Sequence, residues 1–99
     1  MAAQLQCAFG SFRGTGAAIT IAGEKVGFKP RYIKLLKQDG ATSAVLEWQE
    51  GMGDAKGIKD DDVVAEVTAN GITPTSTGFT LGTDAFNADG KAIFYTCLA

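Results

Sequence analysis

The chain has 99 residues, of which 45% are hydrophobic and 20% are charged, and its formal net charge is -2. This length fits one compact domain, and the composition is too apolar for a disordered segment. The small negative charge argues against a general binder of nucleic acid or acidic membranes, because both need an excess of Lys and Arg. We therefore expect a single soluble domain over residues 1–99.

The first part of the chain alternates apolar and other residues with a period of two, which is typical of half-buried strands. One such run covers residues 5–12 and a second covers residues 18–22. Residues 13–16 between them include two glycines, which readily adopt the positive φ angles of a turn. These residues predict two strands joined by a turn.

Residues 26–38 are ambiguous. Arg31, Lys34 and Lys37 recur every third residue, as on one face of a helix. Pro30 precedes most of this run and is suited to the first turn of a helix. The residues alone leave open whether this segment is helical or extended.

The middle of the chain combines two strand signals with an acidic loop. Residues 44–49 are rich in strand formers, with Leu46 and Trp48 on one face. Residues 50–62 contain several glycines and no sustained periodicity, so we predict an exposed loop. Residues 63–68 are again strand-like. Asn70 and Gly71 form the strongest hairpin signal in the chain, and we predict a return strand from Ile72.

The last part of the chain predicts a polar turn at residues 74–77, a short strand with Phe79 and Leu81 on one face, and a loop over residues 83–90. An apolar strand over residues 92–98 closes the chain. About seven to eight short strands, with Gly, Asn and Asp between them and no βαβ rhythm, predict an all-β fold. We expect a single small antiparallel β-sandwich or jelly-roll-like barrel.

The residue types present argue against catalysis. The chain has no histidine, which excludes Ser-His-Asp and Cys-His arrangements. Residues 84–90 resemble a calcium loop, but Ala85 occupies a position that needs a carboxylate and no Glu closes the loop, so we predict a turn. Gly14 and Gly16 complete no nucleotide-binding motif. We expect no enzyme activity, cofactor, metal or small-molecule substrate.

Two kinds of targeting segment that the sequence lacks bear on the cellular compartment we expect for the protein. The sequence has no secretory signal and no apolar stretch long enough to span a bilayer. Cys7 and Cys97 are therefore expected to be free thiols, as is usual in a reducing cytoplasm.

Charged residues are segregated along the chain. Two blocks stand out, a basic one formed by Lys25, Lys29, Arg31, Lys34 and Lys37, and an acidic one centred on Asp60, Asp61 and Asp62. Opposite blocks can pair from copy to copy in a repeating assembly, or both can simply be solvated. We select these eight residues as a possible partner-contact surface. Phe28 and Tyr32, interleaved with the basic block, also suit a stacking platform for single-stranded nucleic acid, or a core position.

Several segments resemble a family of small structural proteins, of decoration or cement type, from the virions of tailed bacteriophages. The first is Gly27-Phe28-Lys29-Pro30-Arg31-Tyr32-Ile33. The second is Glu47-Trp48 leading into Glu50-Gly51-Met52. The third is Gly71-Ile72 followed by Gly78-Phe79-Thr80-Leu81-Gly82-Thr83-Asp84 with Asn87 beyond, and Phe94-Tyr95 matches the usual ending.

This resemblance implies a β-sandwich component of the phage particle, assembled in the host cytoplasm, and an extended conformation for the ambiguous segment after Pro30. The role it favours is a capsid decoration or cement protein that binds the major capsid protein and its own copies as a homo-oligomer. The alternative is an accessory protein of the tail, baseplate or fibre. A third hypothesis, with less support from the net charge, is a module that binds single-stranded nucleic acid.

Overall fold

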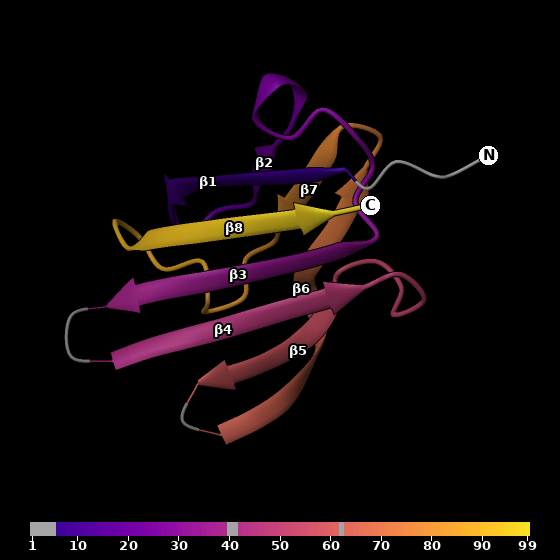
Figure 1. The fold of residues 1–99 in the computed structure, drawn as a ribbon. Helices are drawn as coiled ribbons and strands as arrows, with labels where there is room; N and C mark the ends of the chain where they lie inside the picture. The colour runs from indigo at the N-terminus through magenta and orange to yellow at the C-terminus, as the bar shows by residue number, and fades with distance from the viewer. Residues whose placement is uncertain (1–5, 40–41, 62) are drawn as a thin grey trace.

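The computed structural model describes residues 6–39, 42–61 and 63–99. Over these residues the chain is all-β and antiparallel, as the sequence predicted (Figure 1). A single 3-10 turn, η1 (Gly23–Lys25), is the only helical element described. The strands are β1 (Cys7–Arg13), β2 (Ile19–Ile21), β3 (Tyr32–Asp39), β4 (Thr42–Gln49), β5 (Lys56–Asp61), β6 (Val63–Thr75), β7 (Gly78–Leu81) and β8 (Ala92–Leu98).

All eight strands belong to one sheet in the order β1-β8-β3-β4-β5-β6-β7-β2. The sheet curls into a half-barrel, so that β6, β7 and β2 pass behind β1, β8 and β3 (Figure 1). The curl brings core side chains from β1 and β7, near the two ends of the sheet, into contact. The ring of Phe12 on β1 lies 6.2 Å from the ring of Phe79 on β7, centre to centre.

The concave side of the half-barrel holds the core. Phe79 packs edge-on against Tyr95 at 5.9 Å, and the Tyr95 hydroxyl donates a hydrogen bond to the carbonyl of Lys25 in η1. Apolar side chains from six of the strands fill the rest of this space. They include Ile21, Ile33, Leu35, Leu46, Ile72, Leu81 and Ile93.

The ambiguous segment after Pro30 is strand β3, as the resemblance implied. Its residues alternate between the two faces of the sheet. Ile33 and Leu35 are buried, whereas Lys34 and Leu36 are exposed. The spacing of three between its basic residues does not reflect a helix. In a strand alternate side chains face the same side, and this alternation decides which of them enter the core.

The prediction of an exposed loop throughout residues 50–62 is wrong for its second half, which forms β5. This strand pairs with β4, for example Leu46 with Lys59. Its core-facing positions hold Gly57 and Lys59 in place of large apolar residues. The hydrophobic alternation that reveals a strand in a sequence is therefore missing.

The hairpin predicted at Asn70 and Gly71 is also wrong, since β6 runs through both residues without reversing. Asn70 does adopt a positive φ of 62°, but here it bends the strand. Lys56 pairs with Ile72 while the adjacent Gly57 pairs with Val67, so the residues between are bulged out. The bend allows β6 to pair first with β5 and then with β7.

The two cysteines are free, as expected. Cys97 is opposite Ala8 in the ladder between β1 and β8, and Cys7 is opposite Leu98. Neighbouring residues of a strand point to opposite faces. Cys97 is consequently buried in the core, while Cys7 is exposed on the other side of the sheet.

Candidate protein-interaction surface

The convex outer face of the sheet carries large apolar side chains in contact with solvent. Phe9 is 71% exposed, Phe94 44% and Leu36 40%. These values are unusual for strands whose other face already supplies the core. We call the set the outer apolar band, which comprises Phe9, Phe94, Leu36, the half-buried Val45, Ile58 and Val64.

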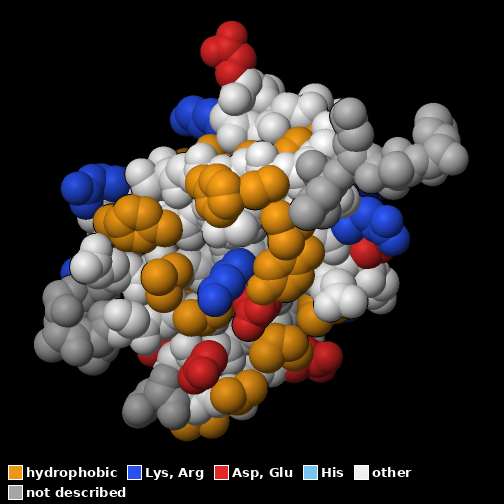
Figure 2. All heavy atoms as spheres, in the orientation of Figure 1, with side chains coloured by type: hydrophobic (Ala, Val, Ile, Leu, Met, Phe, Trp, Pro, Cys, Tyr) orange, Lys and Arg blue, Asp and Glu red, His pale blue; other side chains and the backbone are white. Residues whose placement is uncertain are grey.

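The strand register places the members of this band side by side. Phe94 on β8 is opposite Leu36 on β3, and Leu36 is opposite Val45 on β4. Directly opposite residues on one face of a sheet are close enough to contact each other. Figure 2 shows hydrophobic side chains gathered over these strands, with a basic and an acidic side chain among them. Phe94, Leu36 and Val45 therefore form an apolar row across three strands, and the other members of the band lie diagonally along it.

Charged residues divide the outer face into two halves. Lys34 on β3 is opposite Glu47 on β4, at the centre. Beyond β4 the outward charges are acidic, with Asp60 opposite Val45 and Glu66 opposite Ile58. The outer face is thus basic toward β3 and acidic toward β5 and β6.

Tyr32 and Glu47 form the main polar contact of this face, in which the Tyr32 hydroxyl donates a hydrogen bond to Glu47 Oε2. Partial burial raises the pKa of Tyr32 to about 12, and the hydrogen bond and negative charge of Glu47 act in the same direction. The hydroxyl therefore remains a donor over the physiological pH range.

The structure does not bring the five predicted basic residues onto one surface. Lys25 is in η1, Lys29 is an exposed residue of the segment before β3, and Lys34 is on the outer face. Arg31 is exposed and forms an ion pair with Glu50, with Arg31 Nε 3.1 Å from Glu50 Oε1. The proposed basic surface is divided among these separate places.

Lys37 is buried, with 8% of its surface exposed, which removes it from the predicted contact surface. It follows Ile33 and Leu35 on the core-facing side of β3. Its ammonium lies 5.2 Å from the centre of the Phe86 ring. This cation–π contact explains how a lysine is tolerated there.

The acidic residues Asp60 and Asp61 lie at the end of β5 and are exposed. Asp62 lies outside the described residues. Because Asp60 and Asp61 belong to a strand, their side chains point to opposite faces. Only Asp60 contributes to the outer face.

The predicted stacking platform for single-stranded nucleic acid lacks its first aromatic residue. Phe28 is buried, with 9% of its surface exposed. Lys37 also faces the core, so of the basic and aromatic residues in this segment only Tyr32 and Lys34 share the outer face. The platform as predicted, with Phe28 and Tyr32 exposed among the basic residues, is therefore not formed.

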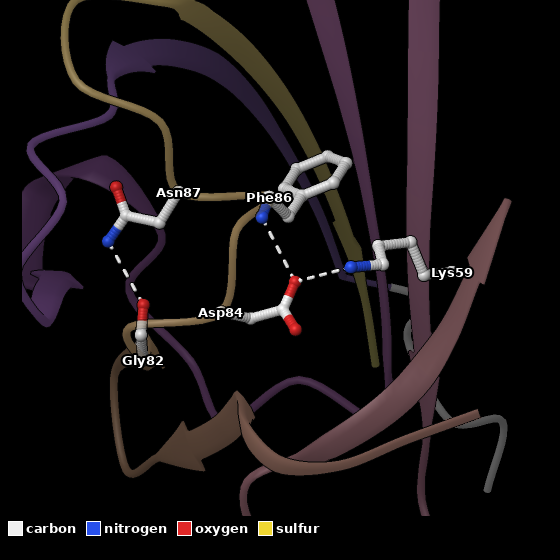
Figure 3. A network of polar contacts seen from close by, with 5 residues as sticks. All are labelled: Lys59, Gly82, Asp84, Phe86 and Asn87. Atoms are coloured by element: carbon white, nitrogen blue, oxygen red, sulfur yellow. Dashed lines mark hydrogen bonds and ion pairs between the residues drawn. The ribbon is translucent and has the colours of Figure 1, made fainter. Parts of the chain in front are cut away.

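The loop between β7 and β8, which resembled a calcium site in the sequence, is held by internal contacts. Lys59 Nζ lies 2.9 Å from Asp84 Oδ2, and the same oxygen accepts a hydrogen bond from the Phe86 N–H at 2.9 Å (Figure 3). Among the described residues, no group of three or more metal-ligating side chains is found. The loop acts as the turn that the sequence predicted, and it places Phe86 in the core.

Asn87 is the second anchor of this loop and is 2% exposed. Its amide donates hydrogen bonds to the carbonyls of Ala17 at 2.6 Å and Gly82 at 3.0 Å, and its side-chain oxygen accepts one from the Thr15 N–H at 2.8 Å. The β1–β2 connection is thereby fixed to the β7–β8 loop. Sequence reasoning treated Asn87 only as part of a turn.

A shallow hollow of about 380 Å³ lies at the end of β3, β4 and β8. The Arg31–Glu50 ion pair forms part of its wall. The remaining lining residues are Tyr32, Gln49, Leu98 and Ala99. Its polar groups are mostly engaged with each other, so the hollow does not suggest a specific small ligand.

Sequence reasoning missed the outer apolar band, although a signal was present. Ile93, Phe94 and Tyr95 are consecutive apolar residues, as are Leu35 and Leu36. Strands with apolar residues on both faces are typical of sheets covered on both sides. Here only the concave side is covered.

Among the described residues, no helix has the length and hydropathy of a membrane span. Comparisons with family models, with curated proteins and with solved structures found no match to this chain.

Proposed function

We propose that this chain is a structural protein of a tailed bacteriophage virion, a capsid decoration or cement protein that binds the major capsid protein and stabilises the head. The resemblance of its Gly-, Pro- and aromatic-rich segments supports the phage context. The outer apolar band supports docking onto another protein, and it is the observation that carries the proposal.

The band has the chemistry of a docking surface. Phe94 and Leu36 project from central strands of a rigid sheet, so burying them against a partner needs no rearrangement of the fold. Fully burying an exposed Leu or Phe side chain contributes about 1.5–3 kcal/mol. Lys34 and Glu47, which lie among the residues of the band, fix the orientation of a bound partner, because only a partner with complementary charges can approach them closely.

The role requires binding and no chemistry. A decoration protein adds buried area where capsid subunits meet and so resists the pressure of packaged DNA. Modest contacts suffice when many copies bind one shell, because each bound copy adds its own free energy to the same particle. A small domain with one apolar face meets this requirement.

The first test is the location of the chain in purified particles. Cryo-electron microscopy is expected to show it in many copies at symmetric positions on the head, with its convex face against the capsid. Copies found only on the tail would contradict the head assignment and support the alternative of a tail accessory protein. Absence from the particle would contradict the virion assignment.

The second test concerns the docking face. A variant with Leu36→Ser and Phe94→Ser is expected to bind heads lacking the chain at least about tenfold more weakly, because it loses two apolar contacts. A matched control is Val63→Ser with Ala65→Ser, which removes exposed apolar groups from the opposite face of β6. Equal binding by both variants would show that the band is not the docking face.

A further inference from the structure

Strand β1 forms a free edge of the sheet. Within the described residues it pairs only with β8, and β2 lies at the other end of the strand order. The ladder with β8 is regular from Cys7 opposite Leu98 to Arg13 opposite Ala92. The edge therefore offers seven residues in extended conformation.

Two hydrogen bonds define which backbone groups of β1 point away from β8. The Ala99 N–H donates to the Gln6 carbonyl at 3.0 Å, and the Gly14 N–H donates to the Lys91 carbonyl at 2.9 Å. Residues that bond to a neighbouring strand alternate along an antiparallel ladder. Even-numbered residues from Gln6 to Gly14 therefore face β8. The outward backbone groups belong to Cys7, Phe9, Ser11 and Arg13, and no hydrogen bond to these groups is found within the described residues.

The edge lacks the devices within a strand that prevent pairing between molecules. Such devices include proline, a bulge, or charged residues along the strand. Strand β1 has no proline, and its register with β8 is unbroken. Its single charged residue, Arg13, is at the end, where Nη1 donates a hydrogen bond to the Gly90 carbonyl at 2.8 Å.

The side chains next to this edge leave its outer side open. Phe9 is 71% exposed on the outer face. On the concave side, the Tyr95 ring passes beneath Gly10 and reaches the Lys25 carbonyl in η1. Among the described residues η1 contacts β1 from the concave side, so a new strand can join along the outer side, beside Phe9.

We propose that two copies of this chain form a dimer by antiparallel pairing of their β1 edges, around a two-fold axis at Gly10. In this register Phe9 is opposite Ser11 of the second copy, and Cys7 is opposite Arg13 of the second copy. Every outward backbone group then meets an outward group. The two sheets become one sheet across the dimer.

A second copy fits this edge better than an unrelated strand because the side-chain pattern is self-complementary. Within one molecule Ser11 is opposite Phe94 on β8. In the dimer Phe9 of the second copy lies on the other side of Ser11, so the small residue sits between two aromatic rings. The two Phe9 residues become diagonal neighbours, at a spacing that aromatic side chains can bridge. The Arg13 residues lie at opposite ends of the joint and do not repel each other.

The proposal is tested first with the purified chain, by sedimentation equilibrium over a range of concentrations. The unmodified chain is expected to form a dimer. Ser11→Pro removes an outward N–H without touching the ladder to β8, because edge positions tolerate proline. Its dimer dissociation constant is expected to rise at least about tenfold. Ser11→Ala is the matched control, since it removes the hydroxyl, keeps the N–H and is expected to dimerise normally.

Disulfide trapping tests the register and does not depend on the proline variant folding. In a Cys7→Ser background, chains with Phe9→Cys are mixed with chains with Ser11→Cys. Opposite residues in a hydrogen-bonded pair have Cα atoms about 5.5 Å apart, a distance that suits a disulfide. The mixture is expected to cross-link faster than either variant alone.

Three outcomes would overturn this proposal. They are a chain that stays monomeric at all accessible concentrations, a dimer that survives Ser11→Pro unchanged, and cross-linking no faster in the mixture than in the single variants. The edge shares Phe9 with the outer apolar band but does not include Phe94 or Leu36, the residues changed in the docking test. A negative result with the purified chain therefore leaves the proposed binding to the capsid standing, and loss of capsid binding leaves the dimer standing.

Discussion

Lys59 on β5 and Asp84 in the β7–β8 loop form an ion pair, with 2.9 Å between Nζ and Oδ2, that joins two sides of the half-barrel. Their side chains are only 21% and 17% exposed, whereas those of the Arg31–Glu50 pair are 69% and 58% exposed. Screening by water weakens the second pair far more than the first. The chain thus contains an internal comparison between a partly buried and an exposed ion pair.

We expect Asp84→Ala to lower the free energy of unfolding by about 1–3 kcal/mol, because it leaves the Lys59 ammonium and the Phe86 N–H without a partner in a partly buried site. Glu50→Ala, the matched change in the exposed pair, is expected to cost less than about 0.5–1 kcal/mol. Urea unfolding followed by circular dichroism measures both. Equal losses would mean that the Asp84 contacts add no stability beyond those of a surface pair.

We expect Asn87→Ala to destabilise the chain by about 2–4 kcal/mol, since three partly buried hydrogen bonds between the loops are lost. Asn87→Asp is expected to be at least as damaging. It replaces the donating amide with an oxygen facing the carbonyls of Ala17 and Gly82, so attraction becomes repulsion. Asp89→Ala, at an exposed position of the same loop, is the control and should change stability little. Thermal unfolding of the three variants compares them directly, and a stable Asn87→Ala protein would contradict the anchoring role.

Strand periodicity and strand-forming composition were sufficient to predict β1, β4 and β8, whereas the residues of β3 left helix and strand open and only the resemblance implied an extended segment. Periodicity failed for β5, where Lys59 occupies a core-facing position and reads as a surface residue. The partner that makes this lysine acceptable, Asp84, is 25 residues away in the chain. Contacts over such distances are not visible in local patterns.

The candidate surface was predictable only in part. Charge segregation suggested Lys34 and Asp60, and both are exposed on the outer face. Charge segregation also suggested Lys37, which lies on the core-facing side of β3 next to Phe86. Charged residue types alone do not show which alternate positions of a strand face the core, and this decides on which face of the sheet each side chain lies. The apolar residues Phe94 and Leu36 were not selected as surface residues.

Gly71 is expected to be intolerant of a side chain. A Cβ at this position would lie 2.6 Å from the Lys56 carbonyl oxygen, where backbone atoms of β5 and β6 meet at the bulge. We predict that Gly71→Ala lowers the free energy of unfolding by about 2 kcal/mol or more, because the clash is with backbone and a core side chain, Val67, is also close. Ala69→Ser, a small change at a nearby exposed residue, is the control. Chemical denaturation measures both. A neutral Gly71→Ala variant would mean that the bulge can shift.

Stability is expected to fall at alkaline pH because the core excludes the Cys97 thiolate. Burial raises the pKa of Cys97 from its ordinary value of 9.0 to about 12, with a smaller contribution from the charge of Cys7. The folded state therefore holds this proton more tightly than the unfolded state. The stability that the protonated Cys97 thiol contributes is fully present below pH 9 and is lost as the pH rises toward 12.

The Cys97→Ala variant isolates this effect, because Tyr32 and Tyr95, whose pKa values are also raised, have ordinary values of 10.0 and ionise later. Between pH 9 and pH 10 we expect the unmodified chain to lose about 1 kcal/mol more than Cys97→Ala, from the linkage between proton binding and folding. Cys7→Ala, which alters the exposed thiol, should keep most of the pH dependence. Urea unfolding at fixed pH values gives each slope. Parallel slopes for the unmodified chain and Cys97→Ala would mean that the thiolate is accommodated in the folded state.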